Sequence, residues 1–243
     1  PPLFPLPANV IPRAAIFLSG SGSNAERILE AIAASGAGAP LQVACLVTDA
    51  PATSRAGDIG RRYGIPVVEH DIREFYRRHG LATTSLATPE GRSLRDLWTA
   101  GLRQALRPHA VHFGIFAGFV PLTNITGDFP CLNVHPGDLT YLKDGRRWLV
   151  GLHSLPVERA ILDGLDHLRS SVIVADPYTD KGDDMDSGII LGISGKVPVD
   201  LQGLALEALR EQFRRRPAQR PKGGYGDALE ALGQHNLTRL KEQ

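Results

Sequence analysis

The chain has 243 residues, with 27 Lys and Arg against 26 Asp and Glu, and therefore a net charge of +1. This length suits one α/β domain with an appendage, and the balanced charge gives no overall field that would attract a polyanion, so we expect no nucleic acid partner. The two cysteines are too few for a disulfide scaffold and both lie in apolar runs, which favours the cytoplasm. No apolar run is long enough to span a membrane.

Residues 1–13 are proline-rich and lack the features of a signal peptide, so we expect an extended arm. Beyond them, apolar runs alternate with helical patterns. The predicted strands lie at 14–18, 41–50, 65–70, 110–118 and 131–137. One predicted helix directly follows the first strand. A second lies at 53–63 and is ended by Gly64, and a third lies at 89–106 and is capped by Thr88. Strands that are apolar throughout predict a parallel sheet covered on both faces, a doubly wound α/β fold.

The pattern changes after residue 137. We expect a loop over 138–152, a helix over 153–162, strands at 170–176 and 188–199, and helices over 201–216 and 225–241. The predicted organisation is the arm at 1–13, a domain at 14–200 and a helical C-terminal extension at 201–243. The basic cluster of Arg214, Arg215, Arg216, Arg220 and Lys222 is explained as a solvated helix end and loop.

A loop of small residues, Gly20-Ser21-Gly22-Ser23-Asn24, joins the first strand to the first helix. The first N–H groups of a helix have no partners within it, so an anion such as a phosphate can bind there where glycine permits close approach. The loop also satisfies G-x-G-x-x-A, and Asp49 ends the second strand where an acid would hold a ribose. An NAD-binding oxidoreductase and a turn without ligand therefore remain alternatives.

The stretch "CLNVHPG" carries two polar residues, Asn133 and His135, that are two positions apart on a predicted strand and therefore project from the same face. Pro136 ends this strand, which puts both side chains near its carboxyl end, where open parallel sheets bind ligands. We expect an amide donor and an imidazole to share one site.

Five aspartates crowd the loop "DPYTDKGDDMDSGII". A calcium loop would need an oxygen ligand at Gly188 and a later bidentate Glu, so we expect no metal. A solvated acidic loop accounts for Asp180, Asp183 and Asp184. Asp186 precedes the next apolar strand and is the aspartate best placed to meet His135.

Together and in this order, "LSGSGSN", "FAGF" at 116–119, "NVHP", Gly-Leu-His at 151–153 and Asp-x-Gly resemble the folate-dependent formyltransferases, above all those that act on glycinamide ribonucleotide. The resemblance covers about residues 14–199. It implies a Rossmann-like formyltransferase fold, 10-formyltetrahydrofolate as formyl donor and no metal.

The resemblance also implies roles for three groups of residues. Gly22, Ser23 and Asn24 bind the phosphate of the acceptor, and the segment of Phe119, Val120 and Leu122 lines the folate pocket. Asn133 and His135 stabilise the oxyanion of formyl transfer, and Asp186 acts through His135 and an ordered water.

The sequence departs from the family pattern at Ile173, where the purine enzyme has a His, and at Pro121, where it has an Arg. The C-terminal helix that supplies ribose contacts has no clear match. We therefore expect formyl transfer to a small, phosphorylated amine, with glycinamide ribonucleotide as first candidate and an amino sugar next. Hydrolysis of the donor is the alternative, the expected partners are small molecules, and a homodimer is left open.

Overall fold

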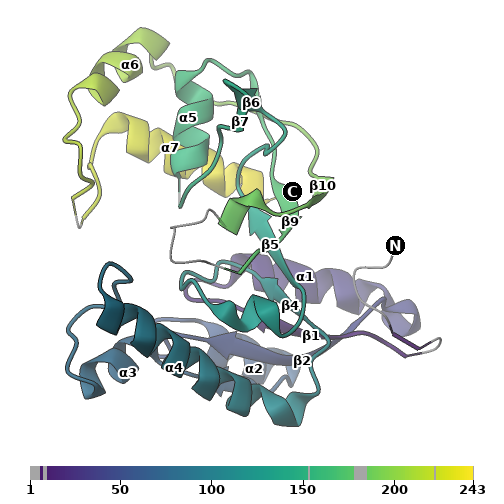
Figure 1. Ribbon diagram of the computed structural model, residues 1–243. Coiled ribbons are helices and arrows are strands. Elements are labelled where there is room, and N and C mark those ends of the chain that lie inside the picture. Colours follow the sequence, from purple (N-terminus) through teal and green to yellow (C-terminus); the bar gives the residue numbers. More distant parts are fainter. Residues whose placement is uncertain (1–5, 8–9, 153, 178–184, 222, 243) are drawn as a thin grey trace. The chain divides into compact units, whose positions relative to one another are not determined.

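The computed structural model describes residues 6–7, 10–152, 154–177, 185–221 and 223–242 (Figure 1). The chain divides into two compact units. Unit 1 comprises residues 1–134 and 174–188, and unit 2 comprises residues 135–173 and 189–243. Among the described residues, no helix has the length and apolar character needed to cross a membrane.

Unit 1 is built on a parallel sheet in the order β5-β4-β1-β2-β3. Its strands are β1 (Arg13–Phe17), β2 (Gln42–Thr48), β3 (Val67–Glu69), β4 (Phe113–Phe116) and β5 (Cys131–His135). Its helices are α1 (Ser23–Ala34), α2 (Ala56–Tyr63), α3 (Ile72–Arg78) and α4 (Pro89–Leu106), with short 3-10 turns η1 (Gly36–Gly38), η2 (Arg107–His109), η3 (Asn124–Gly127) and η4 (Met185–Ser187).

Helices cover both faces of this sheet, α1 and α2 on one and α3 and α4 on the other (Figure 1). Along β1, Ala14 and Ile16 pack toward α1 and α2, whereas Ala15 and Phe17 pack toward α3 and α4. All four side chains are fully buried, which explains why the strand is apolar throughout. The predicted doubly wound α/β fold is confirmed.

Local sequence signals fix several of these boundaries. The Thr88 hydroxyl accepts from the Gly91 N–H at 3.1 Å and caps α4, which begins at Pro89 as predicted. Gly64 ends α2 with a left-handed φ of 66°. Helix α3 was not predicted, although Asp71 caps it by accepting from the Glu74 N–H at 2.9 Å, a pattern visible in the sequence.

Unit 2 pairs its short strands in antiparallel fashion, β6 with β7, β8 with β11 and β9 with β10. The strands are β6 (Leu142–Lys143), β7 (Arg146–Arg147), β8 (His167–Leu168), β9 (Ser171–Val174), β10 (Ile190–Ile193) and β11 (Val197–Pro198), and the helices are α5 (Leu155–Leu162), α6 (Leu206–Arg214) and α7 (Ala228–Lys241). A second apolar core joins the three helices to β8 and β11. The predicted helical tail is confirmed as α6 and α7.

Two expectations for this part of the chain were wrong. Residues 138–152 are not only loop, because β6 and β7 form a hairpin closed by Asp144 and Gly145 with φ of 52° and 74°. Positive φ at both central positions is the geometry that the Asp-Gly pair favours. The single strand expected over 188–199 is two strands, β10 and β11, in different pairings.

A buried ionic network holds the helices of unit 2 together. Arg216 donates to the Glu158 carboxylate of α5 at 2.6 Å and forms two bonds of 2.7 Å to Asp227, which caps α7. The guanidinium lies 4.1 Å from the centroid of the Tyr225 ring, and only 6% of the Arg216 side chain is exposed. The prediction that the basic cluster is solvated is therefore wrong for Arg216. Lys222 lies outside the described residues.

We expect Arg216→Met to lower the free energy of unfolding by about 3 kcal/mol, because it leaves the Glu158 and Asp227 carboxylates buried without their cation. Arg214→Met is the matched control, since Arg214 is largely exposed and pairs with Glu211 on its own helix. Chemical denaturation of both variants checks this. Equal stabilities of the two variants would contradict the role assigned to Arg216.

The same network predicts a pH dependence of stability. The hydrogen bonds from Arg216 lower the pKa of Asp227. A carboxyl with a lowered folded-state pKa stabilises the fold above its unfolded-state pKa of about 3.9, and this stabilisation is lost as the pH falls through the folded-state pKa. Wild type should therefore lose more stability than Arg216→Met on acidification below about pH 4.

Candidate functional site

The chain order of the unit 1 sheet reverses between β1 and β4. From β1 the chain proceeds outward to β2 and β3, whereas β4 leads the other way to β5. In parallel sheets, the loops that leave the carboxyl ends of two such strands diverge and open a crevice for ligands. These loops are residues 20–24, the glycine loop, and residues 117–122, the β4 loop.

The glycine loop ends at α1, whose N-cap is Gly22 with a left-handed φ of 68°. Among the residues that the structure describes, no side chain caps this helix. The first intrahelical donor after the cap is the Glu26 N–H, which bonds to the Gly22 carbonyl at 2.9 Å. The N–H groups of Ser23 and Asn24 therefore point out of the helix start without intrahelical acceptors. The helix start has the backbone donors that an anion site needs, and binding of an anion there stays a prediction.

A cation that the sequence did not indicate lies beside this loop. The Arg55 N–H donates to the Gly20 carbonyl at 3.0 Å, and its guanidinium is 3.4 Å from the Ser21 carbonyl oxygen. Arg55 also pairs with Glu26 in the first turn of α1, and Arg62 pairs with the same carboxylate at 2.7 Å. Two arginines thus outweigh the one carboxylate that would repel an anion.

The two glycines of the loop differ in whether a side chain would fit at their positions. A Cβ atom on Gly22 would lie 2.5 Å from Ile59 Cδ1 and 2.9 Å from Leu18 Cδ1, both in the core. Gly22 therefore serves the packing of the loop against α2 as well as its backbone conformation. Its substitution is not a clean probe of anion binding. Gly20 has open space around the corresponding position.

The predicted folate-lining residues of the β4 loop have different environments. Phe119 joins an aromatic cluster, with ring centroids 5.5 Å from Phe116 and 6.5 Å from Trp98. Val120 is half exposed, and Leu122 is partly buried. Val120 thus presents an apolar side chain to solvent, while Phe119 anchors the loop to the core.

Arg95 of α4 supports this loop from within. Only 3% of the residue is exposed, and its guanidinium donates to the carbonyls of Leu122 at 2.6 Å and Thr84 at 2.7 Å and to the Tyr76 hydroxyl at 3.2 Å. Among the described residues, these hydrogen-bond partners are all neutral oxygens. Arg95 therefore fixes the backbone of the β4 loop, and no local sequence pattern marked it.

Asn133 and His135 lie two positions apart on β5, as predicted. Asn133 is partly buried and belongs to unit 1, where it is the pairing partner of Phe116 on β4. His135 belongs to unit 2 and is 2% exposed. Its Nε2–H donates to the Leu149 carbonyl oxygen at 2.6 Å, because a carbonyl can only accept. Donation by this ring to any second acceptor requires protonation at Nδ1 as well.

Gly137, which follows "NVHP", is required for a steric reason. A Cβ atom on Gly137 would collide with the Leu149 carbonyl oxygen and lie 2.9 Å from His135 Nε2. Only glycine lets the chain pass this close to the hydrogen bond that orients His135.

Asp186 lies in η4, belongs to unit 1 and is 8% exposed. A Cβ atom on Gly188 would collide with the Val174 carbonyl, which explains the glycine of the Asp-x-Gly motif.

Asp180, Asp183 and Asp184 lie outside the described residues, as does the His of Gly-Leu-His. Among the residues that the structure describes, no group of three metal-ligating side chains is present. The pairing of His135 with Asp186 stays a prediction.

Asp49 does not have the environment of a ribose ligand. It is 6% exposed, its carboxylate accepts from the Ser19 hydroxyl, and burial raises its pKa. A carboxylate that holds a ribose must face the cofactor. This removes the main support for the dinucleotide alternative.

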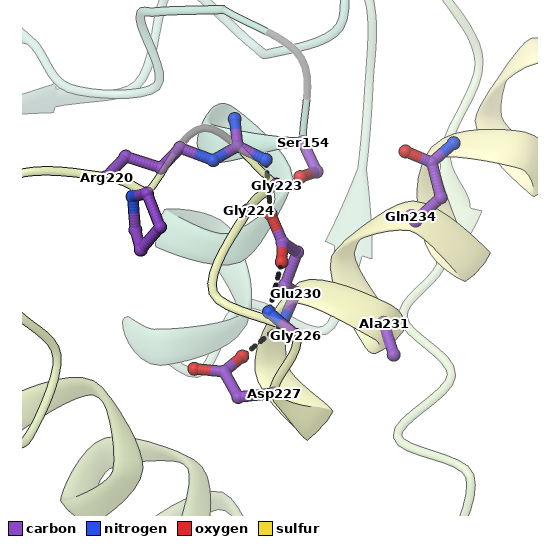
Figure 2. Close-up of a pocket in the computed structure, with 10 residues that line it drawn as sticks. Ser154, Arg220, Gly223, Gly224, Gly226, Asp227, Glu230, Ala231 and Gln234 are labelled. Atoms are coloured by element: carbon purple, nitrogen blue, oxygen red, sulfur yellow. Dashed lines mark hydrogen bonds and ion pairs between the residues drawn. The ribbon is translucent and has the colours of Figure 1, made fainter.

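A pocket of about 710 Å³ lies in unit 2, near the start of α7 (Figure 2). Its carboxylates already have partners, because Asp227 pairs with Arg216 and Glu230 accepts from the Gly226 N–H at 2.8 Å and from Arg220. None of the predicted site residues lines it. The candidate site therefore remains the carboxyl edge of the unit 1 sheet, where the glycine loop and the β4 loop follow β1 and β4.

Sequence comparison identifies no matching family model and no matching curated protein. The fold, by contrast, is similar to solved structures. Glycinamide ribonucleotide transformylase 1 from Symbiobacterium toebii is 20% identical, with a TM-score of 0.58 over 95% of this chain and 86% of that one. Phosphoribosylglycinamide formyltransferase from Brucella melitensis is 22% identical, with a TM-score of 0.58 over 96% and 95%.

A formyltetrahydrofolate deformylase from Pseudomonas syringae pv. tomato is also similar, at 13% identity and a TM-score of 0.56 over 95% of this chain and 60% of that one. The chain therefore has the fold of the folate-dependent formyltransferases. The resemblance found in the sequence is confirmed at the level of the fold.

We expect Gly137→Ala to displace the His135–Leu149 hydrogen bond, since the added methyl group collides with its acceptor. The Nε2 proton of His135, followed by NMR, should then exchange at least about tenfold faster with solvent. Gly192→Ala is the control, because within the described part of the chain no atom lies within 4 Å of the position of its Cβ. An unchanged Nε2 proton in Gly137→Ala would contradict the assigned role of this glycine.

Proposed function

We propose that this protein transfers the formyl group of 10-formyltetrahydrofolate to the amine of a small, phosphorylated acceptor, with glycinamide ribonucleotide as the first candidate. The observation that carries the proposal is the placement of Asn133 and His135 at the carboxyl end of β5, in the formyltransferase fold. The two loops that carry the residues predicted to bind donor and acceptor follow β4 and β1 at the same edge of the sheet.

Formyl transfer requires a hydrogen-bond donor to the oxyanion and a path for the proton that the amine loses. The acceptor nitrogen attacks the formyl carbon, the bond from that carbon to N10 of the folate breaks, and the proton lost by the amine replaces the formyl group on N10. Asn133 and protonated His135 stabilise the negative charge on the formyl oxygen. Asp186 orders the water that carries the proton.

The glycine loop supports a phosphorylated acceptor. Its free backbone donors match phosphate oxygens, and Arg55 adds a positive charge beside them. The half-exposed Val120 supports an apolar, ring-containing donor on the neighbouring loop.

The testing experiment supplies 10-formyltetrahydrofolate with a panel of phosphorylated amines, glycinamide ribonucleotide and phosphorylated amino sugars among them, and follows release of tetrahydrofolate. Turnover that requires a phosphorylated amine supports the proposal. Release without any acceptor would indicate donor hydrolysis instead, and binding of NADH with no binding of a folate analogue would restore the oxidoreductase.

We expect Asn133→Ala and His135→Ala each to lower kcat about 100-fold, since removal of one oxyanion donor costs roughly 3 kcal/mol in the transition state. Steady-state kinetics measure the effect, and circular dichroism verifies the fold of each variant. A well-folded variant of either residue that retains wild-type kcat would contradict its catalytic role.

We expect Arg55→Gln to raise the KM of the phosphorylated acceptor about tenfold and to leave the donor KM unchanged, because one charge-assisted contact to the phosphate is lost. Arg61→Gln is the matched control, since Arg61 is exposed on α2 and pairs with Asp58 on the same helix. Equal acceptor KM values in the two variants would exclude Arg55 from the phosphate site.

A further inference from the structure

Ser19 directly precedes the glycine loop and forms hydrogen bonds across the crevice to the β4 loop. The backbone pairing of β1 with β4 ends at Phe17 and Phe116. Beyond it, the Ser19 N–H donates to the Gly118 carbonyl at 3.1 Å, and the Ser19 hydroxyl oxygen accepts from the Val120 N–H at 2.9 Å. The side chain thus extends the pairing past the end of the strands.

The chain geometry explains why a side chain is needed here. Gly118 has a left-handed φ of 85° and turns the β4 loop away from β1. After this turn, the N–H of Val120 bonds to a side chain instead of a strand carbonyl. The hydroxyl of Ser19 reaches across and takes the place of that carbonyl.

Asp49 fixes the direction of the Ser19 hydroxyl. The hydroxyl donates its one proton to the Asp49 carboxylate, at the end of β2. An ionised carboxylate only accepts hydrogen bonds, so the hydroxyl lone pairs remain turned toward Val120. Three adjacent strands of the sheet, β4, β1 and β2, are joined in this way at their carboxyl ends.

We propose that Ser19, oriented by Asp49, is a positioning residue that holds the acceptor loop and the donor loop in register. This inference rests on the proposed function. Transfer requires the amine and the formyl carbon to lie about 3 Å apart, and small misplacements of bound reactants are costly to the rate. Loss of the hydroxyl therefore acts on kcat more than on the binding of either substrate.

The test compares Ser19→Ala with Ser19→Thr, which keeps the hydroxyl, and with Ser35→Ala, which removes an exposed serine hydroxyl bonded within α1. We expect Ser19→Ala to lower kcat about tenfold, with both KM values within about twofold of wild type. Ser19→Thr should retain most of the activity and Ser35→Ala all of it. A wild-type kcat in Ser19→Ala, or an equal loss in Ser19→Thr, would overturn the inference.

A second measurement is independent of turnover. Hydrogen exchange of the Val120 amide should be at least about tenfold faster in Ser19→Ala than in wild type and unchanged in Ser35→Ala. If wild type transfers no formyl group, the proposed function fails while exchange still tests the bond. An unchanged Val120 exchange rate in Ser19→Ala refutes the positioning role by itself.

Discussion

The parallel pairing of β1 with β4 is the constraint on which the candidate site depends. It places the ends of the two strands side by side, although Phe17 and its partner Phe116 are 99 positions apart in the chain. It also makes the loops that follow leave in different directions. Because side chains on both faces of β1 are fully buried against helices, the pair has little freedom to shift. The positions of the glycine loop and the β4 loop follow from it.

Two buried arginines show how each unit accommodates charge. In unit 1, Arg95 is solvated by neutral carbonyls and a hydroxyl and thereby fixes the β4 loop. In unit 2, Arg216 is neutralised by Glu158 and Asp227 and thereby joins helices α5 and α7. In each arginine, all three guanidinium nitrogens donate a hydrogen bond, as burial of the charge requires. The first supports a loop of the candidate site, and the second supports the helical tail.

The sequence predicts what local patterns determine. Apolar runs gave the parallel strands, the Thr88-Pro89 pair gave the start of α4, and the spacing of Asn133 and His135 gave their common strand. The hairpin at Asp144-Gly145 was missed although its signal is local. Arg55, Arg95 and Ser19 act on segments 27 to 101 residues away, so only the fold reveals them. The same holds for the packing role of Gly22 against Ile59.

The central claim is that donor and acceptor meet at the carboxyl edge of the unit 1 sheet. The most direct measurement is hydrogen exchange by mass spectrometry with a folate analogue that cannot transfer a formyl group, with a phosphorylated amine, and with both. We expect the analogue to slow exchange in residues 117–122 and the amine to slow it in residues 20–26. Protection confined to residues 220–234 around the pocket of unit 2, or found in neither loop, would contradict this account.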